Sequence, residues 1–581
     1  MRTIGVDEIR PGMTGYGLTV FRGTTPERFE VEVIDVLHNF RPGQDLILVR
    51  TLHPILEHAT TVGGMSGSPI YLDGRLAGAY AYGWSFGQDP VVGVTPIRNM
   101  LAELRRPARP DALPGAAPVA AGARGPARLA GLPPYRGGPV EALPALRAHA
   151  ARQPAPTAHG PRTAATPLLL GGFEGRVVRQ LEEALSPFGM VPVQAGGGGG
   201  TDPSAPRRYV DGGAVGVQLI QGDIDATAVG TVTHIEGNRG AAFGHPMLNA
   251  GEPGLPTAVA RVLHILASRS RSFKIAEAGR PLGTLVQDRQ AAIVLETDRA
   301  PDTVALELRV QGVPNAPRTA WSARVASHRA LTPALIGAAI ANAVDATASD
   351  VTPTLVRATS RVHLAGEPET IEVQDVDVAT GGVAGTLGQL RLFPILEAVY
   401  GNPFQEARVE RVEVDLEVTF DRTTVRVVDA ATPVREVDPG SEVPLRVVLQ
   451  RFGEPEAVRV VPVRIPERLA GERVEVLVEA GSAVRVQEPF ARSLGELLAN
   501  IRSAYGSQDL VISLKTPSRG LRFGGHVVRS LPPSALDTLQ QRNDGDRARP
   551  FVTYERSVVP LDAVVSGSAR IELAVRSRPR R

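Results

Sequence analysis

The chain has 581 residues, which corresponds to three or four domains at ~150 residues per domain. Its 63 basic and 61 acidic residues leave a net charge of +2, so the composition predicts no nucleic-acid partner. The absence of cysteine excludes disulfides, thiol catalysis and cysteine-bound metal, and no stretch reaches the roughly 18 consecutive apolar residues of a membrane-spanning helix.

Residues 1–105 are predicted to form the first β domain. The opening segment has acids at Asp7 and Glu8 and no apolar centre, so it does not predict a secretory signal. Short strands follow in GYGLTVFRG, RFEVEVIDVL, DLILVRTL and VVGVTPI, a spacing typical of a small β-barrel or sandwich. Thr95-Pro96 predicts the start of a helix that runs through Leu104. Residues 106–166 are rich in Ala, Pro, Arg and Gly and are expected to be a linker.

A second β domain is predicted at residues 167–345. A helix is expected from about Phe173 to Leu185, and the glycine run from Gly196 to Gly200 lacks the Lys-Ser/Thr of a phosphate loop and predicts a hinge. Strands are predicted at AVGVQLI, ATAVGTVTHI, TLVQDR, AAIVLE and VALELRV, and Thr332-Pro333 predicts a helix to about Val344.

The remaining residues alternate apolar and polar side chains over many short runs. Residues 346–490 are therefore expected to be a sandwich-like β accessory region, with a helix from Pro394 to about Tyr400. Residues 491–581 are expected to be an α+β region, in which Ser493 and Glu496 form the capping box of a helix. We find no catalytic motif in either part.

The segment GGMSGSPIYLDGRLAG, residues 63–78, carries the clearest chemical signal. Gly64 and Gly67 flank Met65-Ser66, which predicts a tight turn that exposes the Ser66 hydroxyl. The amides of Gly64 and Ser66 would then form an oxyanion hole, while Ser68 begins a strand and points away. Asp73-Gly74 predicts the turn of the β-hairpin that follows. A serine so presented is a candidate nucleophile, although a purely structural turn explains the same residues.

A serine nucleophile needs a base, and the chain has 11 histidines. His38, His53 and His58 precede Ser66, but none lies in a glycine turn. His245 does, in FGHPMLNAG, where Gly244 and Pro246 predict a strand end. Folded geometry rather than spacing must decide among them.

The two motifs together resemble the SpoIVB peptidase family of chymotrypsin-like serine proteases. The serine segment extends from GGMSGSPIYLDGRLAG to VVGVTPIRNML, and the histidine segment is GTVTHIEGNRGAAFGH followed by SFKIAEAGRPLGTLVQDRQAAI. The resemblance spans residues 10–105 and 213–310. It implies two chymotrypsin-like β-barrels, Ser66 as nucleophile, His245 as base and a protein or peptide substrate. It also suggests export to the cell envelope.

Two features depart from that family. The serine half comes first here, as in a circular permutation of the two barrels, and no PDZ module is recognisable. The stretch RTLHPILEHATTV contains no aspartate to orient the histidine; Glu57 is its only carboxylate, and Asp45 lies further upstream. Glu57 is therefore the candidate orienting acid, with a surface ion pair as the alternative.

Three functions fit these observations. The chain is predicted to be mainly β, with two chymotrypsin-like barrels, a few helices and a C-terminal sandwich-like region. It is first a candidate serine endopeptidase, second a protease-fold binding or scaffold protein of the cell envelope, and third a structural protein whose glycine turns are only turns. The first requires Ser66 and His245 to lie within hydrogen-bond reach of each other.

Overall fold

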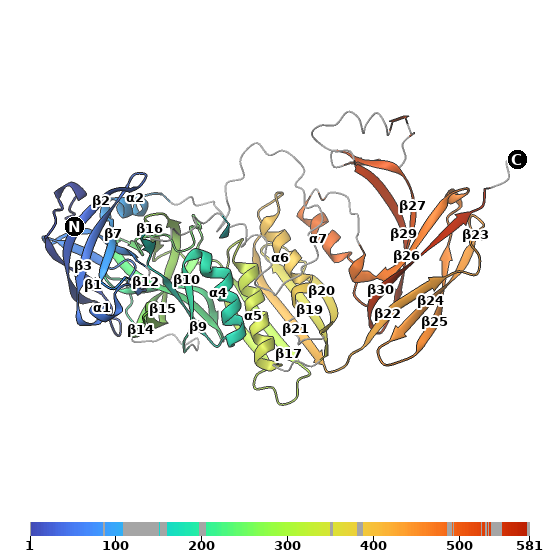
Figure 1. Ribbon diagram of the computed structural model, residues 1–581, viewed down its shortest axis with the longest axis horizontal. Coiled ribbons are helices and arrows are strands. Elements are labelled where there is room, and N and C mark those ends of the chain that lie inside the picture. The colour runs from blue at the N-terminus through green and yellow to red at the C-terminus, as the bar shows by residue number, and fades with distance from the viewer. Residues whose placement is uncertain are drawn as a thin grey trace.

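The protein is mainly β and its strands form three sheets that follow one another along an elongated molecule (Figure 1). A computed structural model describes residues 2–84, 87–107, 150–151, 160–196, 205–348, 353–379, 387–484, 491, 493–523, 526–528, 532, 534–535 and 549–577. The expected fold class, two barrels with few helices followed by a C-terminal β region, is confirmed.

The first sheet is a closed barrel that carries the serine motif. Its strands are β1 (Thr14–Thr19), β2 (Glu27–Arg41), β3 (Gln44–Leu52), β5 (Pro69–Leu72), β6 (Arg75–Gly83) and β7 (Val91–Pro96), with the short β8 (Arg162–Thr163) added to β6. The order is β5-β1-β2-β3-β7-β6, and pairing of β5 with β6 closes the ring. Helices α1 (Pro54–Ala59) and α2 (Ile97–Leu104) belong to the same half, and α2 occupies the predicted range.

The second sheet carries the histidine motif on a barrel-like ring. The ring runs β12 (Asp225–Glu236), β13 (Arg239–Ala242), β16 (Ala292–Glu296), β15 (Ser272–Arg289), β14 (Leu255–Leu266) and β11 (Ala214–Gly222), and β11 pairs back with β12. Strand β4 (Val62–Gly63) of the serine half pairs with β15, and β9 (Thr166–Gly171) and β10 (Met190–Gln194) extend the sheet beyond β12.

An apolar cluster joins the two barrels. Ala79 on β6 and Met100 on α2 pack with Ala241, Val286 and Val294 of the second ring. Tyr80, the neighbour of Ala79, faces the opposite way into the core of the first barrel. Strand β6 is therefore buried on both faces, which explains why its residues are apolar without the usual alternation.

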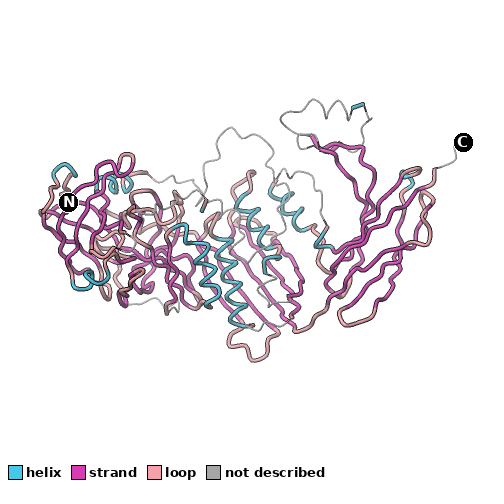
Figure 2. The backbone as a smooth tube through the Cα atoms, viewed as in Figure 1, coloured by secondary structure: helices cyan, strands magenta, loops and turns pink. Residues whose placement is uncertain are grey.

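The second sheet extends beyond the boundary expected at residue 345. Strands β17 (Thr303–Gln311) and β18 (Ala320–Ala326) continue it from β11, and β21 (Val409–Thr419), β19 (Thr354–Leu364) and β20 (Ile371–Ala379) follow, with β17 and β21 parallel. Helices α4 (Gly175–Leu185), α5 (Thr332–Thr347), α6 (Leu392–Gly401) and α7 (Leu494–Arg502) lie side by side (Figure 2). Helices α5 and α6 pack on this extension, whereas α4 packs on β10. The described residues between 353 and 419 thus share one sheet and one core with the histidine half, across the predicted boundary at residue 345.

The third sheet joins the two C-terminal regions that the sequence separated at residue 490. It contains β22 (Thr424–Ala431), β23 (Glu436–Val437), β24 (Glu442–Arg451), β25 (Glu456–Arg464), β26 (Arg473–Ala480), β27 (Asp509–Phe523), β28 (His526–Val528), β29 (Arg549–Pro560) and β30 (Val564–Val575). Strand β30 pairs with β22 up to and including Gly567 and with β26 from Ser568 onward. Gly567 has φ 77°, a left-handed conformation in which a side chain is strained, and β30 changes partner at this residue while its strands share one core. One sheet and one core therefore extend across the predicted boundary at residue 490.

The other sequence predictions have mixed outcomes. Helix α4 begins two residues after Phe173 and ends at Leu185 as predicted, α5 begins at Thr332 and extends three residues beyond Val344, and α6 begins two residues before Pro394. Ser493 caps α7 by accepting from the Glu496 amide at 3.1 Å. Most of the expected linker and of the glycine run lies outside the described residues, but the end of the linker forms strand β8.

Candidate active site

The serine motif forms the tight turn between β4 and β5. Gly64 and Gly67 have φ angles of 89° and 99°, which favour glycine. A side chain on Gly67 would also collide with the second barrel, because an ideal Cβ there lies 1.8 Å from the Thr231 carbonyl oxygen. The Gly67 amide donates to the Tyr80 carbonyl at 2.8 Å, which anchors the turn to β6.

Ser68 has a structural role in this turn. Its amide and its hydroxyl both bond to the Met65 carbonyl, at 2.9 and 2.7 Å. The amides of Met65, Gly67 and Ser68 are thus used within the turn or its anchor, whereas those of Gly64 and Ser66 are not donors in these bonds. Gly64 and Ser66 remain the predicted oxyanion-hole donors.

The histidine lies in the loop after β13, held at both ends. The Thr95 hydroxyl, from the serine barrel, donates to the Gly244 carbonyl at 2.6 Å. On the other side the buried carboxylate of Asp288 accepts from the amides of Met247, Leu248 and Ala250, at 2.8, 2.7 and 3.1 Å. Asp288 therefore fixes the loop that carries His245, and the sequence prediction missed this role because Asp288 lies in a β-strand pattern.

Ser66 and His245 meet across the two barrels. The Ser66 Oγ and the His245 Nε2 are 2.9 Å apart, although 179 positions separate them in the sequence. The His245 Nδ1 is 2.8 Å from the Pro246 carbonyl oxygen. Because a carbonyl only accepts, Nδ1 must carry the proton, which leaves Nε2 to accept from the Ser66 hydroxyl. This is the tautomer that a general base requires.

Both side chains of this pair are buried. Ser66 and His245 are each 1% exposed. Burial lowers the pKa of His245 to about 4, an effect opposed by the Pro246 hydrogen bond and reinforced by the charge of Arg41. The ring is therefore neutral at physiological pH.

Threonines of β12 tie the serine turn to the second barrel. The Thr231 amide donates to the Ser66 carbonyl at 2.8 Å, and its hydroxyl donates to the Gly64 carbonyl at 3.0 Å. The Thr233 hydroxyl donates to the Gly67 carbonyl at 2.7 Å. The position of the serine turn thus depends on docking of the two halves.

A buried lysine underlies the same turn. Lys274 on β15 is fully buried, and its methylenes pack against Gly64. Its Nζ donates to the hydroxyls of Thr19 and Thr231, at 2.8 and 3.3 Å. Burial lowers the pKa of Lys274 to about 7. The alternating pattern of β15, which places this residue on the same side as Ala276, is the sequence signal that could have predicted its burial.

Glu57 is not brought to the histidine. It is exposed on α1, and within the described residues it has no hydrogen bond to His245, whose Nδ1 is bonded to the Pro246 carbonyl. The prediction of Glu57 as orienting acid is thus replaced by a backbone carbonyl, a partner that carries no sequence signal.

The other histidines considered as bases serve elsewhere. His53 caps α1 by accepting from the Ile55 amide and stacks on Phe21. His38 and His58 are exposed.

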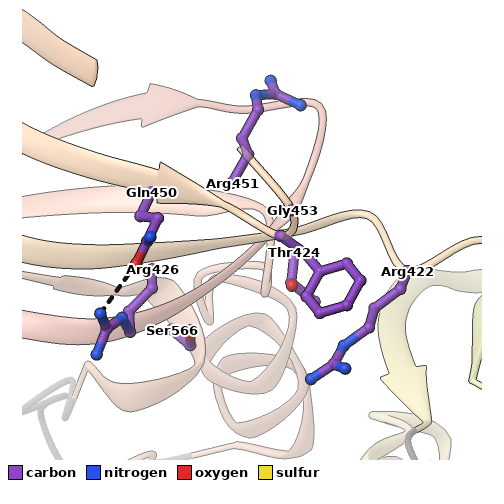
Figure 3. A pocket seen from close by; sticks show the side chains of 8 residues that line it. Arg422, Thr424, Arg426, Gln450, Arg451, Gly453 and Ser566 are labelled. Atoms are coloured by element: carbon purple, nitrogen blue, oxygen red, sulfur yellow. Dashed lines mark hydrogen bonds between the residues drawn. The ribbon is translucent and has the colours of Figure 1, made fainter. Parts of the chain in front are cut away.

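A second group of polar side chains lines a pocket on the third sheet, far from the Ser66–His245 pair (Figure 1). Arg422 lies over the Phe452 ring, with its guanidinium carbon 4.0 Å from the centroid, and Arg426 donates to Gln450 at 3.0 Å (Figure 3). Arg451 forms an ion pair with Asp562. These arginines are committed to protein partners and offer no nucleophile or base.

In the described part of the chain, no group of three or more His, Asp or Glu side chains is arranged to hold a metal. No helix there is long and apolar enough to cross a membrane. Comparisons with models of protein families, with curated proteins and with solved structures found no match.

Proposed function

We propose that this chain is a serine peptidase similar to the SpoIVB family, with Ser66 as nucleophile and His245 as general base. The proposal depends chiefly on the 2.9 Å contact between the Ser66 Oγ and the His245 Nε2. The bond from Nδ1 to the Pro246 carbonyl supports it, because it fixes the tautomer that can take the serine proton.

The residues suggest an acyl-enzyme mechanism. Ser66 attacks a peptide carbonyl while His245 accepts its proton, and the amides of Gly64 and Ser66 stabilise the tetrahedral oxyanion. His245 then returns the proton to the leaving amine, and water hydrolyses the ester by the same route. The Pro246 carbonyl orients the ring but stabilises the imidazolium less than a carboxylate would, so we expect slower turnover than that of a complete triad.

The alternative is a protease-fold binding or scaffold protein of the cell envelope. This alternative is favoured by the burial of Ser66 and His245, each 1% exposed, and by the His245 Nδ1, which is bonded to a backbone carbonyl and to no carboxylate of the described residues. It predicts a folded protein whose serine is inert even when substrate can reach it.

A fluorophosphonate probe, which reacts with activated serines, distinguishes the two functions. The wild type should be labelled, Ser66→Ala should not, and His245→Ala should be labelled far more slowly. Ser68→Ala is the matched control and should keep its labelling, provided that its circular dichroism is native. Labelling that survives in Ser66→Ala would contradict the assignment of the nucleophile.

A further inference from the structure

The edge of β6 beside the serine turn is occupied by a distant part of the same chain. Strand β8 pairs antiparallel with it, so that Thr163 faces Tyr82 and Arg162 faces Gly83. The next amide, that of Ala164, donates to the Ala81 carbonyl at 2.8 Å. Residues 162–164 are thus an added strand of only a few residues, contributed by the segment that connects the barrels.

This edge leads directly to the candidate nucleophile. The residue before Ala81 is Tyr80, whose carbonyl accepts from the Gly67 amide and whose amide donates to the Ser68 carbonyl, at 2.8 and 3.0 Å. Past Ala164, the chain crosses the other side of the turn. An ideal Cβ on Gly63 would lie 2.7 Å from the Ala165 carbonyl oxygen. Residues 162–165 therefore run alongside the Ser66 turn from β6 to Gly63.

The side chain of Ala164 enters a closed apolar space. It is 3% exposed and belongs to the cluster that contains Met65 and Tyr80. A larger side chain would have to displace well-packed neighbours. We therefore expect this edge of β6 to bind peptides that have a small apolar residue at the position of Ala164.

We propose that residues 162–165 occupy the substrate position of the Ser66–His245 site, which they block with the chain's own peptide. Adding an antiparallel strand to a free sheet edge is a general way to bind an extended peptide, with main-chain bonds for affinity and a side-chain pocket for selectivity. The substrate class is then an extended peptide with alanine or another small apolar residue at the position of Ala164. This inference rests on the proposed peptidase activity.

Ala164 is the last residue bonded to β6 before the chain passes Gly63, so its carbonyl is the one we assign to attack by Ser66. Attack of the Ser66 Oγ on the Ala164 carbonyl carbon breaks its bond to the Ala165 nitrogen, which takes the serine proton through His245. Water then releases Ala164 as a carboxylate and restores Ser66. The products would be residues 1–164 and a fragment that begins at Ala165, held together by the contacts between the barrels.

Labelling rates of the full-length protein test the proposal. Ala164→Pro removes the amide that donates to Ala81, and Ala164→Glu puts a charge into the apolar space. Both should unblock the site and speed fluorophosphonate labelling at least about tenfold, the factor that corresponds to losing an ordinary hydrogen bond. Pro161→Ala, next to the paired residues, is the matched control and should react like the wild type. Added peptide GPRTAATP, which copies residues 160–167, should slow labelling of the Ala164 variants.

A second measurement does not require either Ala164 variant to fold. Intact mass and N-terminal sequencing of the wild type, with Ser66→Ala as control, detect any cut between Ala164 and Ala165. Such a cut, or faster labelling of natively folded Ala164 variants, supports the proposal. Equal labelling of all proteins without a cut overturns it and leaves the peptidase intact. Absence of labelling in the folded wild type and in both folded variants overturns the peptidase as well.

Discussion

Replacing Lys274 by methionine should stabilise the barrels below neutral pH. Methionine keeps the unbranched chain that packs on Gly64 but removes the amine, which is desolvated by burial. The amine donates to two threonine hydroxyls but, among the described residues, forms no ion pair with a carboxylate, so the lost hydration of its charge is offset only in part.

The size and sign of this change in stability follow from the pKa of Lys274. Burial lowers it from 10.5 to about 7, and this difference of 3.5 units corresponds to about 5 kcal/mol. Between these pH values the native state binds fewer protons than the unfolded state, so the free energy of unfolding of the wild type rises with pH. The destabilisation is complete below about pH 7 and gone above about pH 10.5. After subtracting about 1 to 2 kcal/mol for the lost hydrogen bonds, Lys274→Met should gain about 3 to 4 kcal/mol at pH 6 and lose about 1 to 2 kcal/mol above about pH 10.5, where only the hydrogen-bond term remains.

The difference can be measured by urea unfolding followed by the fluorescence of Trp84, the residue directly after β6. A Trp321→Phe background removes the other tryptophan. Wild type and Lys274→Met are compared at pH 6, 8 and 10. Lys515→Met is the matched control, because the Glu475 bond raises the pKa of that partly exposed lysine. The reasoning is refuted if Lys274→Met and the wild type show the same pH dependence of stability.

Three further changes test the geometry of the site. Asp288→Ala leaves three loop amides without their acceptor and should destabilise the protein by about 3 kcal/mol or more, with slower Ser66 labelling in whatever remains folded. Because burial lowers the pKa of His245 to about 4, labelling of Ser66 should stay level from pH 8 to about pH 5 and fall below that. The free energy of unfolding should already decline from about pH 6.5 downward. A loss of labelling near pH 6.5 would mean that the His245 ring is solvated. Gly67→Ala, whose added Cβ meets the Thr231 carbonyl at 1.8 Å, should slow labelling by about a hundredfold by shifting the turn, and an unchanged rate would contradict the close packing of the halves.

Local patterns in the sequence predicted the elements and the two motifs well. Glycines on both sides of Met65-Ser66 predicted the turn, and alternation predicted the strands, because both signals depend on neighbouring residues alone. Pairing between distant strands has no such local signal, so the parallel contact of β17 with β21 and the change of β30 from β22 to β26 at Gly567 were missed.

The site was predictable only in part, for the same reason. Ser66 and His245 were identified from their motifs and a family resemblance, and the structure brings them into contact. The group that orients the ring is a backbone carbonyl at Pro246, which every residue type supplies, so a search for carboxylates selected Glu57 instead. Strand β8 lies in a segment whose composition predicts a linker, and only its pairing with β6 reveals it.

Because the candidate site is shared between two barrels, it can form during synthesis only after both barrels have been made. The ribosome makes Ser66 some 179 residues before His245, an interval of roughly 10 to 35 seconds at ordinary elongation rates. Throughout that time the serine has no partner from β12, no lysine beneath its turn and no imidazole. Under the proposed mechanism, Ser66 of a nascent chain is therefore unreactive toward other newly made proteins, and its activation requires the second barrel to be synthesised and docked.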